Sequence, residues 1–234
     1  MKRSEIKALI LRVGGTNCDR ETATAFRDLG VKVEVKHNRR TIKERNLLDC
    51  NILVFPGGFS YGDYVRSGAI WAKEIEASLL DDLMKFVKDG RPVLGICNGF
   101  QILVELGLLP GLQGRAAYPE AALATNASNV YECRWVHLRN LSRGKCLFTR
   151  LIPRNSVVRI PVAHGEGRLI FPREKEEKYL QQLYENDQIV FRYAKLNDAF
   201  AEGEYPHNPN GAFHDIAGVC SPEGNIFGLM PHPE

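Results

Sequence analysis

The residue best suited to covalent chemistry in this chain is a cysteine between two glycines, in Gly95-Ile96-Cys97-Asn98-Gly99. The apolar run Pro92–Ile96 before it predicts a buried strand, and the pattern of Asn98–Leu106 after it predicts a helix. A nucleophile flanked in this way sits on a sharp strand-to-helix turn, or elbow, whose strained backbone pushes the side chain out of the sheet edge. The N-terminus of the helix then favours thiolate over thiol. The alternative is a cysteine that packs as a small apolar residue, but the bracketing glycines favour a nucleophile.

A candidate base for this nucleophile lies in Pro231-His232-Pro233-Glu234, directly after the apolar strand Ile226–Met230. A thiolate nucleophile needs a base, and the base needs a third group that orients it. The prolines favour an extended segment, in which His232 and Glu234 point the same way because they are two residues apart. The carboxylate would raise the basicity of the imidazole and fix its tautomer. The alternative is a solvated tail, but the preceding strand and the elbow favour a catalytic pair.

Acyl transfer at Cys97 would also need two backbone N–H donors for the oxyanion that forms. Asn98, the residue after the nucleophile, offers one of them. The loop Pro56-Gly57-Gly58-Phe59-Ser60-Tyr61-Gly62-Asp63 follows another apolar run, and its two adjacent glycines leave the backbone free to approach the nucleophile. A Gly-Gly pair alone is most often a plain turn, so this interpretation depends on the elbow.

The segment His164-Gly165-Glu166-Gly167 lies between two predicted strands and admits two interpretations. A His and a Glu close together could bind a metal, but the second glycine and the lack of other clustered ligands in the sequence weigh against it. We therefore expect a loop that lines the substrate site, and no metal centre.

Short apolar runs alternate with helical patterns in the first hundred residues, which predicts a parallel sheet covered on both faces. Three runs end in Val13-Gly14-Gly15, Phe55-Pro56-Gly57-Gly58 and Ile96-Cys97, so a parallel sheet brings these ends to one edge, where ligands bind. We expect one α/β domain over residues 1–234, a mostly parallel sheet flanked by helices with an added β portion. The expected strands are Lys7–Val13, Val31–His37, Asn51–Phe55, Pro92–Ile96, Asn129–Leu138, Ser156–Val162, Arg168–Phe171, Gln188–Ala194, Ile216–Cys220 and Asn225–Met230. The expected helices run from Asn17 or Asp19 to Leu29, and over Leu79–Lys88, Asn98–Leu106 and Glu174–Asn186.

The composition excludes several classes of protein. Apolar residues make up 44% of the 234 and charged residues 25%, which is typical of a globular protein. Basic residues exceed acidic ones by only 31 − 28 = 3, too few to indicate a nucleic-acid surface. No apolar run approaches the roughly 20 residues of a membrane helix, and the N-terminus does not read as a secretory signal. Six scattered cysteines without a C-x-x-C pair indicate reduced thiols and a cytoplasmic location.

Taken together, these motifs resemble the class I glutamine amidotransferases, which use a cysteine triad. The shared features are the elbow, the upstream Pro-Gly-Gly loop and the terminal His-Pro-Glu. Within that group the resemblance is strongest to the glutaminase subunits of phosphoribosylformylglycinamidine (FGAM) synthase in purine synthesis, and it spans nearly the whole chain. The segments that carry it are Val54–Trp71, Gly95–Gln101, Pro161–Arg168 and Gly228–Glu234.

The resemblance implies a flavodoxin-like open sheet and the chemistry of a glutaminase. Cys97 would attack the side-chain amide of glutamine to give a glutamyl thioester and ammonia. His232 would shuttle the proton and Glu234 would orient the histidine. The N–H groups implied to form the oxyanion hole are those of Gly58 and Asn98. The groups implied to hold the amino-acid head of glutamine are Phe59, Gln101 and the backbone of His164 and Gly165.

The same resemblance implies partners rather than cofactors. The ammonia would pass to a larger synthetase subunit that uses ATP and Mg, and in split versions of the enzyme a small third subunit completes the complex. The chain itself is expected to need no metal or organic cofactor and to contact neither nucleic acid nor membrane. Family members usually continue beyond the position of Glu234 with an arginine and a short tail, so a terminal carboxylate here would add negative charge near His232.

Three alternatives remain open from the sequence. The first is another glutaminase of the same group, serving GMP, CTP or pyridoxal phosphate synthesis; the run Phe59–Tyr64 argues against it. The second is a non-catalytic docking module, which would have no need for all of Cys97, His232 and Glu234. The third is a cysteine peptidase or hydrolase with the same elbow, which rates on glutamine against peptide or ester substrates would separate.

Overall fold

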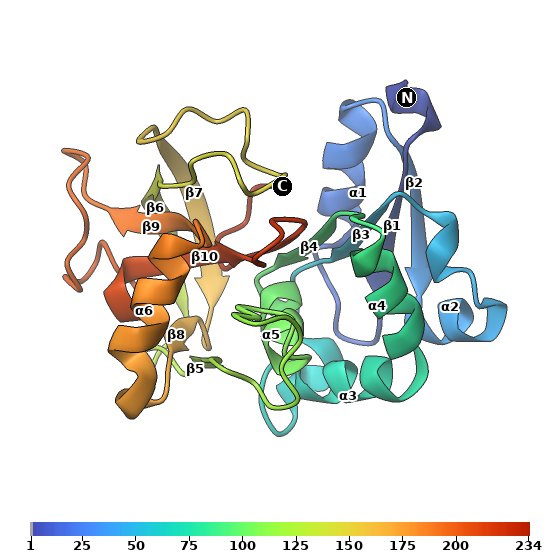
Figure 1. Ribbon diagram of the computed structural model, residues 1–234, viewed down its shortest axis with the longest axis horizontal. Helices are drawn as coiled ribbons and strands as arrows, with labels where there is room; N and C mark the ends of the chain where they lie inside the picture. Colours follow the sequence, from blue (N-terminus) through green and yellow to red (C-terminus); the bar gives the residue numbers. More distant parts are fainter. Residues whose placement is uncertain (1) are drawn as a thin grey trace.

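One nine-stranded sheet runs through the molecule, which the computed structural model describes over residues 2–234 (Figure 1). Its strand order is β2-β1-β3-β4-β11-β10-β9-β6-β7, so the last strand of the chain lies beside β4. The strands are β1 (Lys7–Arg12), β2 (Lys32–His37), β3 (Ile52–Phe55), β4 (Val93–Ile96), β6 (Glu132–Asn140), β7 (Val157–His164), β9 (Ile189–Ala194), β10 (Ile216–Cys220) and β11 (Ile226–Leu229). A separate antiparallel pair joins β5 (Ala122–Ala124) to β8 (Arg168–Ile170).

The large sheet has a parallel half and an antiparallel half. Neighbours from β2 to β11 are parallel, and neighbours from β11 to β7 are antiparallel. Parallel neighbours need crossover connections, which the helices of the first half supply. The helices are α1 (Asp19–Asp28), α2 (Asn38–Glu44), α3 (Ala69–Ser78), α4 (Leu80–Lys88), α5 (Asn98–Glu105) and α6 (Glu176–Glu185). Within residues 2–234 none of these is both long and apolar enough to cross a membrane. The predicted α/β fold with an added β portion is confirmed.

Some elements differ from the sequence prediction. Helices α2 and α3 lie in segments for which the sequence predicted no element. The seven residues of α2 begin where the His37 ring accepts the Arg39 N–H at 3.3 Å, a local cap that the apolar pattern does not reveal. Strand β6 begins at Glu132 rather than Asn129, because its register is set by pairing with β7 and because Asn129 has a left-handed φ of +56°.

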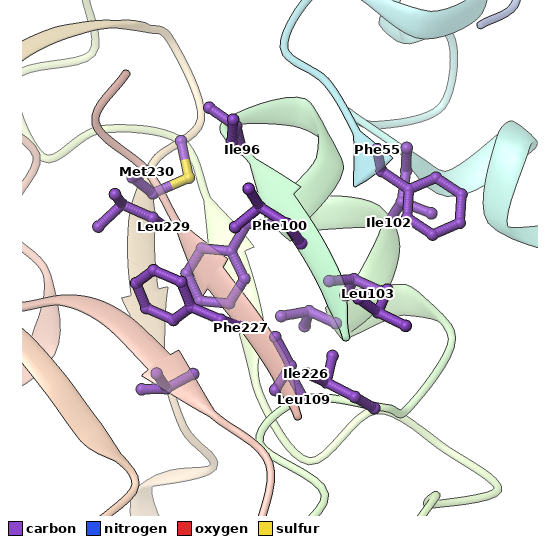
Figure 2. Close-up of a cluster of buried hydrophobic side chains, with 14 of the residues drawn as sticks. Phe55, Ile96, Phe100, Ile102, Leu103, Leu109, Ile226, Phe227, Leu229 and Met230 are labelled. Carbon is purple, nitrogen blue, oxygen red and sulfur yellow. The ribbon is translucent and has the colours of Figure 1, made fainter. Parts of the chain in front are cut away.

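The core at the junction of the two halves fixes the elbow against the last strand (Figure 2). Phe100 of α5 is fully buried and lies over β11. A Cβ at Gly228 of β11 would collide with this ring, so the glycine is what allows the close contact. Helix α5 therefore holds its N-terminus, where the elbow is, close to the strand that leads to His232.

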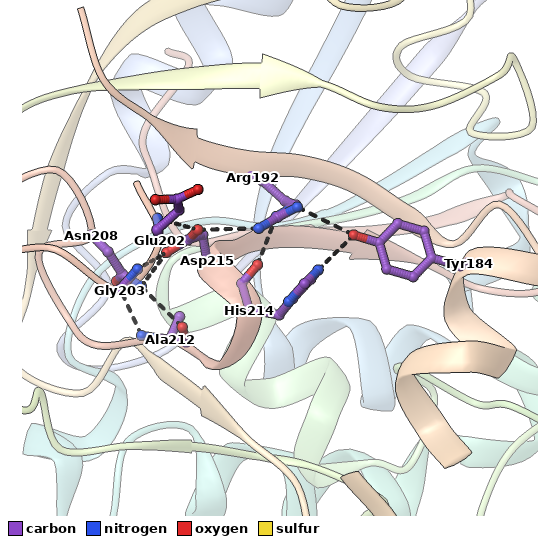
Figure 3. Close-up of polar contacts among 8 residues, drawn as sticks. All are labelled: Tyr184, Arg192, Glu202, Gly203, Asn208, Ala212, His214 and Asp215. Atoms are coloured by element: carbon purple, nitrogen blue, oxygen red, sulfur yellow. Dashed lines mark hydrogen bonds and ion pairs between the residues drawn. The ribbon is translucent and has the colours of Figure 1, made fainter. Parts of the chain in front are cut away.

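A buried ion pair organises the loop between β9 and β10 in the antiparallel half (Figure 3). The Arg192 guanidinium lies 3.2 Å from the Asp215 carboxylate, and their side chains are 8% and 1% exposed. Asp215 also accepts the backbone N–H groups of Glu202 and Gly203, each at 2.8 Å. The loop over residues 199–211 is thus held by hydrogen bonds to one carboxylate.

Candidate active site

The turn at Cys97 has the strained geometry that the elbow predicts. Cys97 lies between β4 and α5 with φ +49° and ψ −105°, a combination that residues other than glycine rarely adopt. Its N–H donates to the carbonyl of Leu229 at 2.8 Å, which ties the turn to the end of β11. Strain of this kind costs about 1–3 kcal/mol and persists where the surrounding structure imposes it. The thiol is 3.7 Å from the Ala163 carbonyl oxygen of β7, at the carboxyl edge of β4.

The two glycines of the elbow are required by close packing. A Cβ at Gly95 would lie 2.6 Å from the carbonyl oxygen of Gly99, and a Cβ at Gly99 would collide with the carbonyl group of Phe55. A side chain at either position would therefore push α5 away from the sheet and move the nucleophile with it.

The C-terminal segment brings His232 and Glu234 to the same edge. The His232 N–H donates to the Pro161 carbonyl at 2.9 Å, which docks the segment on β7. Ring atom Nδ1 lies 2.8 Å from Glu234 Oε1, and the two side chains are 12% and 5% exposed. The other ring nitrogen, Nε2, is buried and has no hydrogen-bond partner among the described residues. This nitrogen remains available to exchange a proton with a thiol.

The surroundings of His232 favour its protonated form. Burial lowers the pKa of the ring, but the neighbouring side chains of Cys18, Cys97 and Glu234 favour the protonated form, outweigh burial and raise the pKa of His232 to about 12. A proton that leaves a neighbouring thiol is therefore held on the imidazole, as an ion pair of thiolate and imidazolium requires.

Two backbone N–H groups predicted to form an oxyanion hole are free of other bonds. Gly58 lies opposite Thr16 in an isolated antiparallel bridge, but the hydrogen bonds of this bridge are made by the neighbouring residues. The N–H of Gly58 itself makes no backbone hydrogen bond within residues 2–234. Asn98 is the first residue of α5, and its N–H is likewise unpaired there. The Ser60 N–H donates to Asn98 Oδ1 at 3.3 Å, which holds the glycine loop beside the elbow.

Gln101 was predicted to contact the substrate. In the structure both polar atoms of its side chain form hydrogen bonds within the protein. Its Nε2 donates to the Glu166 carbonyl at 2.5 Å, and its Oε1 accepts from Asn98 Nδ2 at 2.9 Å. The Glu166 carboxylate in turn accepts the Ser67 N–H at 3.0 Å. Gln101 thus connects the elbow to the 164–167 loop.

His164 is buried among amide side chains rather than exposed in a binding site. Its Nδ1 lies 3.2 Å from Asn126 Oδ1, and its side chain is 2% exposed. Burial lowers the pKa of His164 to about 4, with a smaller effect from His232, so the ring is neutral. Its neighbour Gly165 lies near the aromatic ring of Tyr131, while Phe59, also predicted to contact substrate, is 40% exposed.

Comparisons with known proteins agree with this geometry. A CobB/CobQ-like glutamine amidotransferase domain matches residues 5–234. A phosphoribosylformylglycinamidine synthase subunit PurQ from Archaeoglobus fulgidus is 49% identical over 244 aligned positions, which cover 100% of this chain and 89% of that relative. The chain belongs to the PurQ family of glutamine amidotransferases.

Solved structures place the PurQ-family chain among class I glutaminases in fold as well. The structure of PurLQS from Thermotoga maritima matches with a TM-score of 0.74 and 33% identity, over 97% of this chain and 87% of that one. The glutaminase domain of Trypanosoma brucei CTPS, solved with bound acivicin, matches with a TM-score of 0.51 and 11% identity over 97% of this chain and 86% of that one, which shows the shared fold alone.

Two residues at the site of this PurQ-family chain were not predicted from its sequence. Cys18, just before α1, lies 3.9 Å from His232 Nδ1. Tyr131 packs against Phe59 with ring centroids 6.2 Å apart, and its pKa is raised by burial and further by Cys97. Neither has a local sequence signal, because each reaches the site only through the folding of distant segments.

Proposed function

We propose that this glutaminase subunit of FGAM synthase releases ammonia from glutamine at Cys97. The observation that carries the proposal is the convergence of a strained cysteine, a buried histidine and a carboxylate at one sheet edge. The three come from two segments far apart in the sequence, and no structural role of the core requires them together.

In the first step the Cys97 thiolate attacks the side-chain amide carbon of glutamine. The N–H groups of Gly58 and Asn98 are free to stabilise the oxyanion of the tetrahedral intermediate. The His232 imidazolium then donates its proton to the departing nitrogen, so that ammonia leaves and a glutamyl thioester remains. Glu234, bonded to Nδ1, holds the ring with Nε2 available throughout.

In the second step a water molecule replaces ammonia. His232, now neutral, accepts a proton from the water as the oxygen attacks the thioester carbonyl. Collapse of the second oxyanion breaks the carbon–sulfur bond, releases glutamate and restores the thiolate beside the imidazolium. The thiolate supplies the nucleophile and the histidine moves both protons, so neither step calls for a metal or an organic cofactor in this chain.

We place the amino-acid head of glutamine between the Phe59 side chain and the backbone of His164 and Gly165. Phe59 and Tyr131 are both partly exposed beside this loop and offer apolar surface to the methylene groups of the substrate. Gln101 holds this loop in place through its hydrogen bond to the Glu166 carbonyl. Its role is to position the binding surface rather than to contact the reacting atoms.

The ammonia passes to the partner subunits of the synthase. The PurLQS structure from Thermotoga maritima, in which a 33% identical chain occurs, supports a complex with a large synthetase subunit and a small third subunit. ATP and Mg are used by the large subunit. The six cysteines of this chain are free, which fits a reducing cytoplasmic location.

Substitution of the nucleophile tests the proposed division of labour. In the reconstituted complex, Cys97→Ala should lower glutamine-dependent synthesis by roughly a thousandfold or more, because the covalent route is lost. Synthesis driven by added ammonium should remain, since Cys97 acts only in ammonia release. Cys133→Ala, which removes an exposed thiol, is the matched control and should retain both activities. Loss of the ammonium-driven reaction in Cys97→Ala would falsify the division.

A further inference from the structure

A second thiol, that of Cys18, lies beside His232 at the ring nitrogen that also contacts Glu234. Cys18 Sγ is 3.9 Å from His232 Nδ1, and Glu234 Oε1 is 2.8 Å from the same nitrogen. One donor atom from each of the three residues lies within 4.8 Å of the others. The mechanism proposed above uses His232 and Glu234 but leaves Cys18 without a role.

The carboxylate of this cluster has an unused oxygen. The Glu234 side chain is only 5% exposed, and its Oε2 has no hydrogen-bond partner among residues 2–234. A buried acceptor without a partner is unfavourable, because it has lost its hydrogen bonds to water without replacing them. The carboxylate is therefore arranged to accept a further ligand beside the thiol and the ring.

The space next to the cluster is kept clear by a glycine. A Cβ at Gly57 would lie 3.2 Å from Cys18 Sγ and 2.7 Å from His232 Cε1. The thiol itself is held in place by its backbone, because the Cys18 N–H donates to the Gly57 carbonyl at 3.3 Å and Thr22 Oγ1 donates to the Cys18 carbonyl at 2.6 Å. Cys18 is half-buried, so a small ion can reach it from solvent.

We propose that Cys18, His232 and Glu234 form a binding site for Zn²⁺, and that Zn²⁺ bound there inhibits the enzyme. Thiolate, imidazole and carboxylate are the three ligand types that zinc takes in proteins, at about 2.0–2.3 Å. Around one tetrahedral ion such donors are roughly 3.3–3.8 Å apart, so the Nδ1–Oε1 pair at 2.8 Å must separate and the Sγ–Nδ1 pair at 3.9 Å must close slightly, which side-chain rotations allow. A water molecule fills the fourth position. Binding displaces the proton of the Cys18 thiol and the proton on Nδ1.

The inhibitory effect rests on the proposed function. Zinc on Nδ1 separates the ring from Glu234 and withdraws electron density from Nε2. The ring then no longer accepts the proton that Cys97 must lose, so neither ammonia release nor thioester hydrolysis proceeds. The Cys97 thiol takes no part in the metal site, which distinguishes this inhibition from direct capture of the nucleophile.

Metal binding can be tested without any glutamine chemistry. Metal-free Cys97→Ala protein is titrated with Co²⁺, and a thiolate-to-cobalt charge-transfer band should saturate at one ion per chain and disappear when Zn²⁺ is added. When Cys18→Ser is added, the band should disappear. Zn²⁺ affinity should fall by more than the roughly 10–100-fold that is typical when a residue supporting a ligand, rather than a ligand itself, is removed. Adding Cys133→Ser instead should leave both unchanged. A band that survives Cys18→Ser, or no stoichiometric binding in Cys97→Ala, overturns the site.

Inhibition is measured separately in the complex. Each variant is compared with its own rate in the absence of metal, so any direct effect of Cys18→Ser on turnover cancels. Zinc should inhibit glutamine-dependent synthesis by the wild-type and Cys133→Ser complexes, and this inhibition should be lost in Cys18→Ser. Equal inhibition of Cys18→Ser overturns the proposal. If zinc binds as described but the chain has no glutaminase activity, the proposed function fails and the metal site stands.

Discussion

The chemistry proposed for this chain depends on single backbone groups as much as on side chains. Gly58 has a φ of +141°, and a Cβ there would lie 2.8 Å from the backbone nitrogen of Asn17 and from the carbonyl oxygen of Gly15. Any side chain at this position must therefore move the loop that presents the free N–H. The oxyanion hole is the part of the site that tolerates such movement least.

Substitution of Gly58 by alanine should thus impair catalysis more than folding. We expect Gly58→Ala to lower the glutaminase kcat by roughly 10²–10³-fold, the loss that follows removal of one oxyanion donor, while ammonium-dependent synthesis persists. Gly14→Ala is the matched control, because a Cβ there meets nothing within 4 Å. Steady-state kinetics of both variants measures the effect. A Gly58→Ala enzyme with wild-type kcat would show that this N–H is not a donor.

A second prediction at the residue scale concerns the buried, neutral His164. Burial lowers its pKa to about 4, below the 6.5 of an unfolded histidine, so between these values the unfolded chain binds the extra proton and the folded chain does not. The free energy of unfolding should therefore fall as the pH drops from 6.5 towards 4, by up to about 3 kcal/mol from this residue.

Chemical denaturation at several pH values measures this slope. His164→Gln should flatten it, because the variant has no proton to gain on unfolding at that position. Above pH 7 both states of the histidine are neutral, so there the difference between variant and wild type should not depend on pH. A slope that is unchanged in His164→Gln would contradict the assignment of the acid sensitivity to this ring.

At the scale of elements, the sequence predicted best where local pattern and tertiary structure agree. The inner strands of the parallel half (β1, β3, β4 and β11) are largely buried, so they are continuous apolar runs, as Ile52–Phe55 illustrates. Helix α3 was missed although Trp71 within it is fully buried, because a helix packed on several sides has no clear apolar stripe. The start of strand β6 was predicted at the wrong residue, because pairing with its partner strand, not its own sequence, determines where it begins.

The ion pair in the antiparallel half gives a prediction at this scale. Asp215→Ala should lower the free energy of unfolding by about 3–5 kcal/mol, because it leaves Arg192 buried and uncompensated and also frees the N–H groups of Glu202 and Gly203. Asp215→Asn keeps an oxygen for one of the two donors, which bond to different carboxylate oxygens, and should lose less. Urea denaturation of both variants checks the order. A loss below about 1 kcal/mol for Asp215→Ala, the size of an exposed pair, would contradict the organising role of this carboxylate.

At the scale of the whole molecule, the site lies where the parallel and antiparallel halves of the sheet meet. Figure 1 shows the chain ending between the two halves. Strand β4 of the first half delivers Cys97, while β11 delivers His232 and pairs with both β4 and β10. The motifs predicted the residues of this site because nucleophile, base and orienting group each have a local pattern. Cys18 and Tyr131 could not be predicted, since only the folded chain brings them to the junction.

The most direct test of the central claim is covalent labelling of the nucleophile. The chain in its reconstituted complex is treated with an electrophilic glutamine analogue, and intact mass followed by peptide mapping locates the adduct. The structure predicts one adduct per chain, on Cys97, that excess glutamine prevents and that Gly14→Ala does not reduce. Labelling distributed over other cysteines, or an adduct on Cys97 that glutamine does not prevent, would contradict a glutamine site built around this residue.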